Sequence, residues 1–302
     1  MSHDNKPGIR EWLALFLLML VWGSSFILIK KGLVSFNSLE VGALRISISF
    51  MVLLPFALRS VRRISRNRLI YFVMAGVFGN GIPPFLFAKA QTVIDSYLAG
   101  VLNSLTPLFT LLIGLMLFGR KSRWVNVLGV FIGLIGAIGL LSVVHDPELG
   151  NGMWYGLLVV VAAICYALNM NIIKTYLAGY DALTITSSVF AIIGLPALIF
   201  LFAGTSFTQT MATHPESWNS LGYIAILAII GTAASMVLHN WLIKRTSALF
   251  ASTVTYLMPI VSIFWGIIDG EAFLLVYLLW IATILIGVYL ANRRYDIATR
   301  NP

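Results

Sequence analysis

The stretch SYLAGVLNSLTPLFTLLIGLMLFG, from Ser96 to Gly119, decides the fold class of this 302-residue chain. It is long enough to cross a bilayer, for which a helix needs about 20 mainly apolar residues. Polar residues and a proline nevertheless lie inside it. A second stretch, SALFASTVTYLMPIVSIFWGIIDG from Ser247 to Gly270, repeats the pattern, with Pro259 in the place of Pro107. Two such related spans predict a duplicated membrane protein.

The composition supports an integral membrane protein. Hydrophobic residues make up 59% of the chain and charged residues 10%, with a mean hydropathy of +0.93, whereas soluble domains are about 45–50% apolar and about 25% charged. The single cysteine, Cys165, allows neither a disulfide framework nor a thiolate metal site. We expect no metal and no cofactor. The net charge of +9 is explained by cytoplasmic loops rich in Lys and Arg, so no nucleic-acid partner is predicted.

The apolar runs predict ten transmembrane helices between two polar tails, residues 1–10 and 293–302. The first run lacks a small-residue cleavage pattern and is therefore expected to be a retained span. The expected spans are Glu11–Leu33, Ser38–Leu58, Leu69–Ala90, Ser96–Gly119, Trp124–Val144, Gly152–Leu177, Ala182–Ala203, Leu221–Ile243, Ser247–Gly270 and Ala272–Asn292.

The loop charges predict the orientation. Most of the 20 basic residues fall on one side of the ten spans, which the positive-inside rule makes cytoplasmic. The opposite side has Lys30, Lys31 and Lys89, with acidic turns around Asp146 and Glu148 and around Asp269 and Glu271. Both termini are therefore expected in the cytoplasm of a bacterial inner-membrane protein. The cytoplasmic basic residues are Lys6, Arg10, Arg59, Arg62, Arg63, Arg66, Arg68, Arg120, Lys121, Arg123, Lys174, Lys244, Arg245, Arg293, Arg294 and Arg300.

The two halves of the chain, residues 11–144 and 152–292, align with each other. Residues 22–33 match residues 166–177 at a spacing of 144, and residues 69–80 match residues 221–232 at a spacing of 152, the spacing of the two prolines. Each half holds five spans. Since five is odd, the halves must be inverted relative to each other, as in many secondary transporters.

Several motifs resemble a known family. They are Trp22-Gly23-Ser24-Ser25-Phe26, Arg45, Leu105-Thr106-Pro107-Leu108, Leu257-Met258-Pro259-Ile260, Gly270-Glu271 and the series Gly129, Gly133 and Gly136. On these residues the chain resembles the ten-helix EamA-type members of the drug/metabolite transporter superfamily. The first half departs with Gly119-Arg120 in place of Gly-Glu, and the second half with Tyr166-Ala167 in place of Trp-Gly. The resemblance implies a proton-coupled or facilitative exporter of small metabolites, often amino acids, that works by alternating access.

Arg45 is the most informative candidate, because a charged residue inside a span is costly and suggests function. It lies seven residues into the second span. It could attract a substrate carboxylate, or it could have a structural role by reaching the interface or bonding backbone carbonyls. Glu40 is not expected to pair with it, since residues five apart point to different faces of a helix.

Polar stripes mark the two proline-containing spans. Asn103, Thr106 and Thr110 share one helical face, and Thr255 and Ser262 occupy matching positions in the other half. These side chains could bond helices together or line a cavity, helped by carbonyls that Pro107 and Pro259 release as hinges. The pairing of the stripes favours a cavity.

Further candidates come from the remaining spans. His239 could relay protons, or it could be a neutral, hydrogen-bonded residue near the cytoplasmic end. Asn80 lies among Gly79, Gly81, Pro83 and Pro84, which favour a broken helix. The aromatic residues could line a pocket or sit at the membrane interface. The proposed substrate-binding set is Arg45, Trp22, Ser25, Asn80, Asn103, Thr106, Tyr166, Asn169, Thr255 and Tyr256.

No HExxH motif or phosphate-binding loop lies in the spans, so an enzyme is not expected. The leading hypothesis is export of an amino acid or similar small amphipathic metabolite by a protein embedded in the lipid bilayer. Whether protons are the coupling ion is left open. An alternative is efflux of cationic drugs or quaternary amines, for which Glu40 is the one candidate carboxylate. A non-transporting membrane enzyme or scaffold is a third hypothesis. The sequence leaves the oligomeric state open.

Overall fold

The computed structural model describes residues 7–119, 123–143 and 152–291, and within these ranges it contains helices and no strand. The tail 293–302, residues 1–6 of the other tail, and Arg120, Lys121, Asp146 and Glu148 lie outside the described residues. The helices are α1 (Ile9–Gly32), α2 (Ser38–Ser60), η1 (Val61–Arg63), η2 (Arg66–Arg68), α3 (Leu69–Gly76), η3 (Val77–Gly81), α4 (Pro83–Ala90), α5 (Ser96–Asn103), α6 (Thr106–Phe118), α7 (Trp124–Val143), α8 (Gly152–Tyr176), α9 (Ala182–Ala203), α10 (Phe207–Thr213), α11 (Ser217–Ala228), η4 (Ile229–Ala234), α12 (Ser235–Arg245), α13 (Ala248–Ser252), α14 (Val254–Ile268) and α15 (Leu275–Ala291).

Ten apolar helical segments lie where ten spans were predicted. Among the described residues, eight are long and apolar enough to cross a membrane, and two, Trp124–Leu140 and Leu275–Ala291, are apolar but shorter. The short helix α10 was not predicted. Asn37 and Asp181 start α2 and α9 in the same way, each accepting backbone N–H groups of the first helical turn, which stabilises a helix start.

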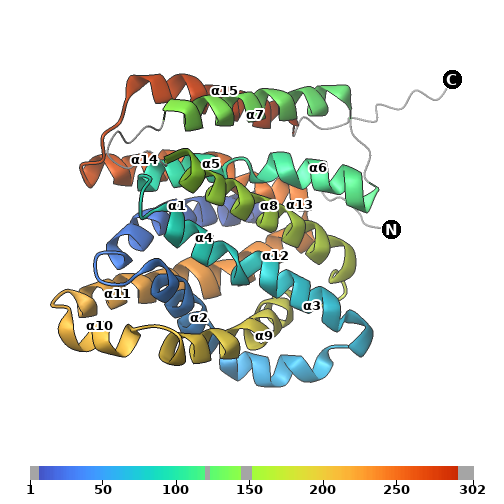
Figure 1. Ribbon diagram of the computed structural model, residues 1–302. Helices are drawn as coiled ribbons and strands as arrows, with labels where there is room; N and C mark the ends of the chain where they lie inside the picture. Colours follow the sequence, from blue (N-terminus) through green and yellow to red (C-terminus); the bar gives the residue numbers. More distant parts are fainter. Residues whose placement is uncertain (1–6, 120–122, 144–151, 292–302) are drawn as a thin grey trace.

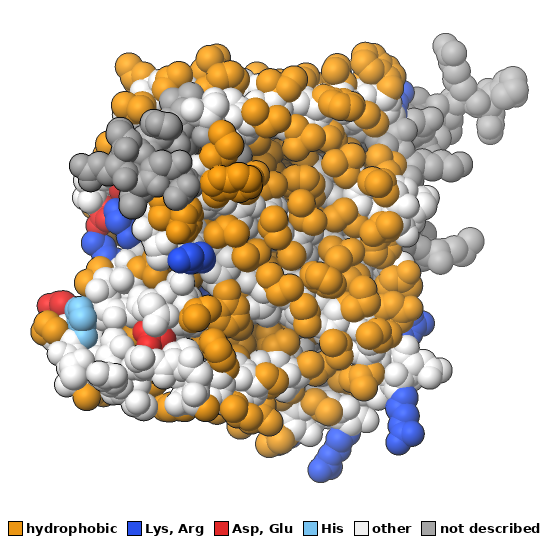
Figure 2. All heavy atoms as spheres, in the orientation of Figure 1, with side chains coloured by type: hydrophobic (Ala, Val, Ile, Leu, Met, Phe, Trp, Pro, Cys, Tyr) orange, Lys and Arg blue, Asp and Glu red, His pale blue; other side chains and the backbone are white. Residues whose placement is uncertain are grey.

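The helices run side by side in layers (Figure 1). The pair α7 and α15 forms one outer layer, α2 and α9 lie at the opposite face, and α1, α4, α8 and α12 lie between them. The start of α1, the end of α15 and the turn between α2 and α3 lie on the same side of the molecule. Figure 2 shows apolar side chains over the middle of the visible face. Many large apolar side chains of the protein are more than half exposed, for example Phe16, Leu195 and Ile260. Such a large apolar surface suits lipid and not water.

Four spans are interrupted near the middle of the molecule. The two spans that carry the aligned prolines break into α5 and α6 just before Pro107, and into α13 and α14 at Thr253. The predicted hinge Pro259 lies inside α14. The other two contain π-helical segments, η3 and η4. Such segments occur frequently at functional sites. The break at η3 was anticipated from the glycines and prolines around Asn80, whereas η4 was not, although its residue Thr232 aligns with Asn80.

The pair α7 and α15 packs through glycines. A Cβ atom placed on Gly287 would lie 2.2 Å from the backbone nitrogen of Gly133 and 2.6 Å from the carbonyl oxygen of Gly129. Gly129 and Gly133 belong to the glycine series of α7, and small residues of this kind let two membrane helices approach closely. The two helices therefore have no room for a side chain at this crossing.

Candidate functional site

A buried cavity of about 50 Å³ lies between α1, α2, α4, α5, α6, α8, α12 and α14. Most of the predicted binding residues line it, together with the predicted relay residue, although they come from both halves of the chain. They are Trp22, Ser25, Arg45, Asn103, Thr106, Tyr166, Asn169, His239 and Thr255. The structure thus brings into one place residues that are up to 233 positions apart in the sequence.

Two predicted binding residues lie elsewhere. Tyr256 turns toward α15, where its hydroxyl donates to the carbonyl of Val288 at 3.3 Å, and Asn80 lines a second, smaller cavity. The polar stripes are divided as well. Thr110 and Ser262 donate to carbonyls of their own helices and do not line the cavity, so part of each stripe has the structural role and part the cavity role.

The apolar residues that line the cavity were not singled out as binding residues from the sequence. They include Phe26, Phe87, Met170 and Met236, and the rings of Phe26 and Phe87 pack 5.7 Å apart. An apolar residue on the cavity side of a membrane helix looks the same in sequence as one facing lipid. Among these apolar residues, only Met258 could be associated with the cavity from the sequence, because it lies three residues after Thr255 and therefore on the same helical face.

Arg45 enters the cavity from α2 and is 6% exposed. Its Nε donates to Thr232 Oγ1 at 2.8 Å, and its guanidinium interacts with the hydroxyl of Tyr166. No carboxylate of the described residues forms an ion pair with it. Glu40 is occupied at the start of its helix, where it accepts the N–H of Asn37 at 3.0 Å. Because buried charges in proteins are normally paired, Arg45 is a cation without its anion.

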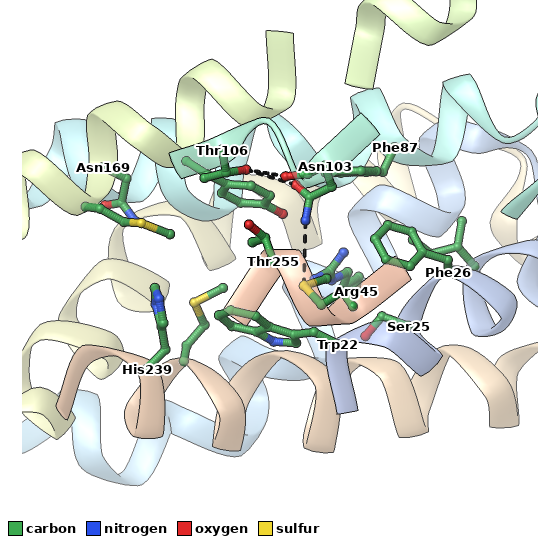
Figure 3. A pocket seen from close by; sticks show the side chains of 15 residues that line it. Trp22, Ser25, Phe26, Arg45, Phe87, Asn103, Thr106, Asn169, His239 and Thr255 are labelled. Atoms are coloured by element: carbon green, nitrogen blue, oxygen red, sulfur yellow. Dashed lines mark hydrogen bonds between the residues drawn. The ribbon is translucent and has the colours of Figure 1, made fainter. Parts of the chain in front are cut away.

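Asn103 adds a second donor beside Arg45. Among the described residues, its side-chain nitrogen has only the sulfur of Met258 as acceptor, at 3.8 Å, and a thioether is a weak acceptor. Thr106 Oγ1 donates to the Asn103 carbonyl at 2.7 Å, which fastens the break between α5 and α6. Figure 3 shows Arg45 and Asn103 pointing toward the same part of the cavity. Together they form a site suited to an anionic group.

Side chains of α1 and α2 satisfy the backbone of η4. Trp22 Nε1 donates to the carbonyl of Gly231 at 2.9 Å, and Ser49 donates to the carbonyl of Ala228 at 2.9 Å. A π-helical segment releases carbonyls from the regular ladder, and in a membrane these must find other donors. Trp22 therefore has both a structural hydrogen bond and a face toward the cavity.

His239 lies at the other end of the cavity, near Asn169 (Figure 3). Its ring packs against Trp22 with centroids 4.8 Å apart, and its Nε2 is buried without a hydrogen-bond partner among the described residues. An imidazole is the one side chain here whose ordinary pKa lies near neutrality. Among the residues that line the cavity, His239 is the only imidazole.

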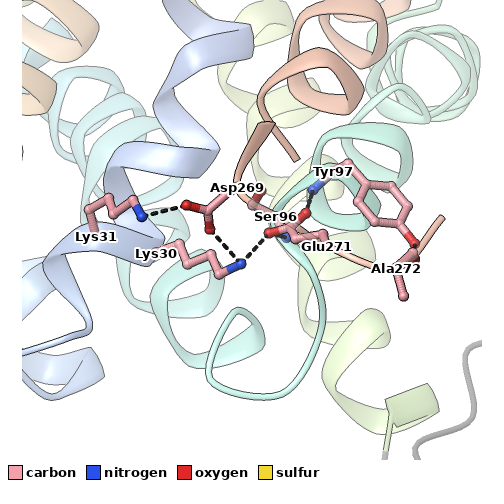
Figure 4. A network of polar contacts seen from close by, with 7 residues as sticks. All are labelled: Lys30, Lys31, Ser96, Tyr97, Asp269, Glu271 and Ala272. Carbon is pink, nitrogen blue, oxygen red and sulfur yellow. Dashed lines mark hydrogen bonds and ion pairs between the residues drawn. The ribbon is translucent and has the colours of Figure 1, made fainter. Parts of the chain in front are cut away.

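A network of charges joins the two halves at one end of the molecule (Figure 4). Lys30 at the end of α1 pairs with Asp269 and Glu271, each at 2.8 Å, and Lys31 also pairs with Asp269. Glu271 also accepts the N–H of Ser96 at 3.0 Å, at the start of α5, where a negative charge is stabilised by the helix dipole. This cluster, which we call the latch, holds α1, α5 and the α14–α15 loop together.

Two carboxylates, Asp269 in the latch and Asp95 beside it at the start of α5, differ in their pKa. Burial works to raise the pKa of Asp269, but the hydrogen bonds and charges of Lys30 and Lys31 outweigh it and lower that pKa. Asp95 has the opposite shift. Burial, with a further contribution from the charge of Glu271, raises the pKa of Asp95 to about 6. The folded protein therefore favours a protonated Asp95.

Thermal stability is expected to fall by a few degrees as the pH rises from about 4 to about 6. In this window an unfolded Asp95, with its ordinary pKa of 3.8, is ionised, whereas the folded protein holds it protonated up to about 6. The stabilisation is thus complete below the lower pKa and is lost as the pH passes the higher one. Asp95→Asn should flatten the dependence in melting curves of the purified protein. An equal slope in wild type and variant would assign the effect to another group.

No group of three or more His, Cys, Asp or Glu residues that could hold a metal ion occurs in the described part of the chain. The site offers instead a guanidinium, an amide, an imidazole and aromatic walls. Such groups bind and orient a small polar molecule.

Comparison with known proteins places the chain among membrane transporters. The model of the EamA-like transporter family matches residues 10–142 and again residues 153–293. Over 291 residues the chain is 24% identical to an uncharacterised transporter of Archaeoglobus fulgidus, with 95% of this chain and 100% of that protein covered. It is 27% identical over 286 residues to the uncharacterised inner membrane transporter YedA of Escherichia coli, with 92% and 89% covered.

Two further similarities concern a named exporter and a solved structure. The chain is 22% identical over 289 residues to a probable terminal-alkyne amino-acid exporter of Streptantibioticus cattleyicolor, covering 93% of each protein. A solved crystal structure, titled without a function, matches with a TM-score of 0.64 at 20% identity, covering 93% of this chain and 96% of the other. The structural match shows that the fold is shared.

Proposed function

Because the chain belongs to the EamA-like transporter family, we propose that it exports amino acids across the plasma membrane by alternating access. The chain is a multi-pass membrane transporter, and its named relatives are transporters and not enzymes. The observation that carries the substrate class is the buried guanidinium of Arg45, which has no carboxylate partner among the described residues. A substrate carboxylate supplies the missing anion.

The surroundings of Arg45 fit an amino acid. Arg45 and Asn103 offer N–H donors to a carboxylate, and a guanidinium binds both carboxylate oxygens at once. Phe26, Phe87 and Met170 offer apolar and aromatic contacts for a side chain. Export is supported by the relative named as a probable amino-acid exporter. Transport direction and substrate are parts of the proposal.

The proposed topology has both termini in the cytoplasm and two inverted five-helix repeats, residues 11–144 and 152–292. The family model matches the chain twice, over similar bounds, and the basic turn between α2 and α3 lies on the side where α1 begins and α15 ends. The latch then lies on the outer side. We propose that it closes the outer end of the cavity and opens when substrate is released.

The cationic-drug alternative has less support. No carboxylate lines the cavity, and Arg45 would repel a cationic substrate that has no carboxylate of its own to pair with it. Glu40, the carboxylate considered for this alternative, is held by the backbone at the start of α2. Proton coupling through His239 stays part of the proposal, because its unpartnered Nε2 lies at the cavity.

The proposal is tested by flux measurements on the purified protein in liposomes. We expect labelled amino acids to cross the membrane faster than in liposomes without protein, and a pH gradient to change the rate if His239 exchanges protons. The panel should cover acidic, basic, aromatic and aliphatic amino acids. Absence of flux for every amino acid, alongside a working control transporter, would refute amino-acid transport.

A further inference from the structure

A second, smaller cavity adjoins the first. It measures about 10 Å³, room for about one water-sized group. Asn169 and Met236 line both cavities, so the smaller one is a continuation of the end opposite Arg45. Its other polar lining residues are Asn80 from η3, Thr186 from α9 and Asn240 from α12.

This small cavity occupies a position equivalent to that of the Arg45 guanidinium in the other half. At the spacing of 144 that relates the helix starts at Asn37 and Asp181, Arg45 corresponds to Val189. At the spacing of 152, Thr232, which accepts from Arg45, corresponds to Asn80. Val189 and Asn80 both line the small cavity. A short apolar side chain thus stands where the other half has a long cationic one.

The contacts around the two positions support this correspondence. In one half, Ser49 Oγ donates to the carbonyl of Ala228 at 2.9 Å. At the same two spacings, Ser49 corresponds to Ile193 and Ala228 to Gly76. These two residues are also in contact, since a Cβ atom on Gly76 would lie 3.0 Å from the side chain of Ile193.

A second pair of contacts agrees. In one half, a Cβ atom on Gly231 would lie 3.1 Å from Ser25 Oγ. In the other half, Gly231 corresponds to Gly79 and Ser25 to Asn169. A Cβ atom on Gly79 would lie 2.5 Å from the side chain of Asn169. The two π-helical segments therefore face equivalent neighbours.

The polar groups of the small cavity accept hydrogen bonds. Thr186 donates to the carbonyl of Ala182 at 2.9 Å and accepts the amide N–H of Asn240 at 2.9 Å. This arrangement leaves Asn240 Oδ1 for another donor. Asn169 Oδ1 is buried without a partner among the described residues, and Asn80 is 6% exposed. Three side-chain amides, those of Asn80, Asn169 and Asn240, line this one small space. Their oxygens can accept from a primary ammonium, which has three donors and no acceptor.

We propose that the small cavity is a subsite for a primary ammonium group of the substrate, which takes the place that the Arg45 guanidinium has in the other half. This inference rests on the proposed amino-acid transport and narrows it. The substrate carboxylate lies at Arg45, its chain follows the apolar wall, and its distal ammonium lies among the three asparagines. Basic amino acids such as lysine are then the preferred substrates. A trimethylated ammonium is too large for a cavity that holds one water-sized group.

The test compares lysine, norleucine and trimethyllysine in the liposome assay. Lysine and norleucine have side chains of equal carbon number, and only lysine ends in an ammonium. We expect wild-type protein to carry lysine at least about tenfold faster than norleucine, the ratio that corresponds to a hydrogen bond with a charged group, and trimethyllysine no faster than norleucine. Equal rates for lysine and norleucine would overturn the subsite.

Two Asn80 variants test whether the small cavity causes the preference for lysine over norleucine. Asn80→Leu should lower the ratio of lysine flux to norleucine flux about tenfold. Asn80→Asp adds a negative charge and should raise this ratio. If one variant does not fold, the other still tests the subsite. The matched control is Asn219→Leu on the exposed face of α11, which should keep the wild-type ratio. A ratio unchanged in both Asn80 variants would overturn the subsite. Flux of neither compound while other amino acids move would overturn it as well, whereas no flux of any amino acid would refute the proposed function itself.

Discussion

Replacing Arg45 by alanine is expected to reduce amino-acid transport by at least about a hundredfold. The guanidinium is buried, and among the described residues no carboxylate pairs with it. Removing one partner of a buried charge pair costs about 3–5 kcal/mol, and each 1.4 kcal/mol corresponds to about tenfold. The loss should appear in the apparent affinity for the substrate, measured as the concentration dependence of flux.

Two variants separate binding from folding at this position. Arg45→Lys keeps the positive charge but loses the two-pronged geometry, so transport should fall less than in Arg45→Ala. Thr232→Val removes the acceptor of Arg45 Nε and leaves the charge, so its effect should be smaller still. If Arg45→Ala folds and transports normally, Arg45 is not the substrate's partner.

Replacing Gly287 by valine is expected to prevent α7 and α15 from packing. The new Cβ would lie 2.2 Å from the backbone nitrogen of Gly133, and the backbone, unlike a flexible side chain, cannot move aside without separating the helices. Overpacking of a core commonly costs about 1–3 kcal/mol, and a clash with backbone exceeds that range. The expected result is a large loss of folded protein in size-exclusion chromatography and a lower melting temperature.

The control for this substitution is Gly222→Val on α11, where a Cβ would meet nothing within 4 Å. It should leave the yield and the melting temperature close to wild type. If Gly287→Val gives the same yield and melting curve as Gly222→Val, the close approach of α7 and α15 is not required for the fold.

The spans could be predicted because a bilayer imposes one strong requirement, a long apolar helix. Because of the same requirement, apolar residues that line the interior cannot be distinguished in the sequence from apolar residues that face lipid. Phe26 and Phe87 line the cavity, yet they look like lipid-facing residues in the sequence. Polar residues inside spans were better guides, and Arg45, Asn103 and Thr255 meet in one cavity. Tyr256 was selected for the same reason, but its hydroxyl bonds the carbonyl of Val288, a partner that no local pattern indicates.

The π-helical segments show what the repeat adds to local patterns. Around Asn80, the neighbouring glycines and prolines predict an interrupted helix. Around Thr232, by contrast, residues Ile229–Ala234 contain no proline. Thr232 aligns with Asn80, but no break was predicted there, and the structure shows the matching π-helical segment η4. Equally, the absence of a carboxylate near Arg45 depends on how helices far apart in sequence pack together. For that reason the sequence left open whether Arg45 attracts a substrate carboxylate or has a structural role, and the packing favours the substrate.

The central claim is that Arg45 binds the carboxylate of the substrate. The most direct measurement uses unmodified protein in liposomes and compares, as inhibitors of flux, the amino acid that is carried fastest and its carboxamide, which has the same shape without the negative charge. The account predicts that the carboxamide inhibits at least about tenfold more weakly, because the lost ion pair is buried. Equal inhibition by the two compounds would contradict it.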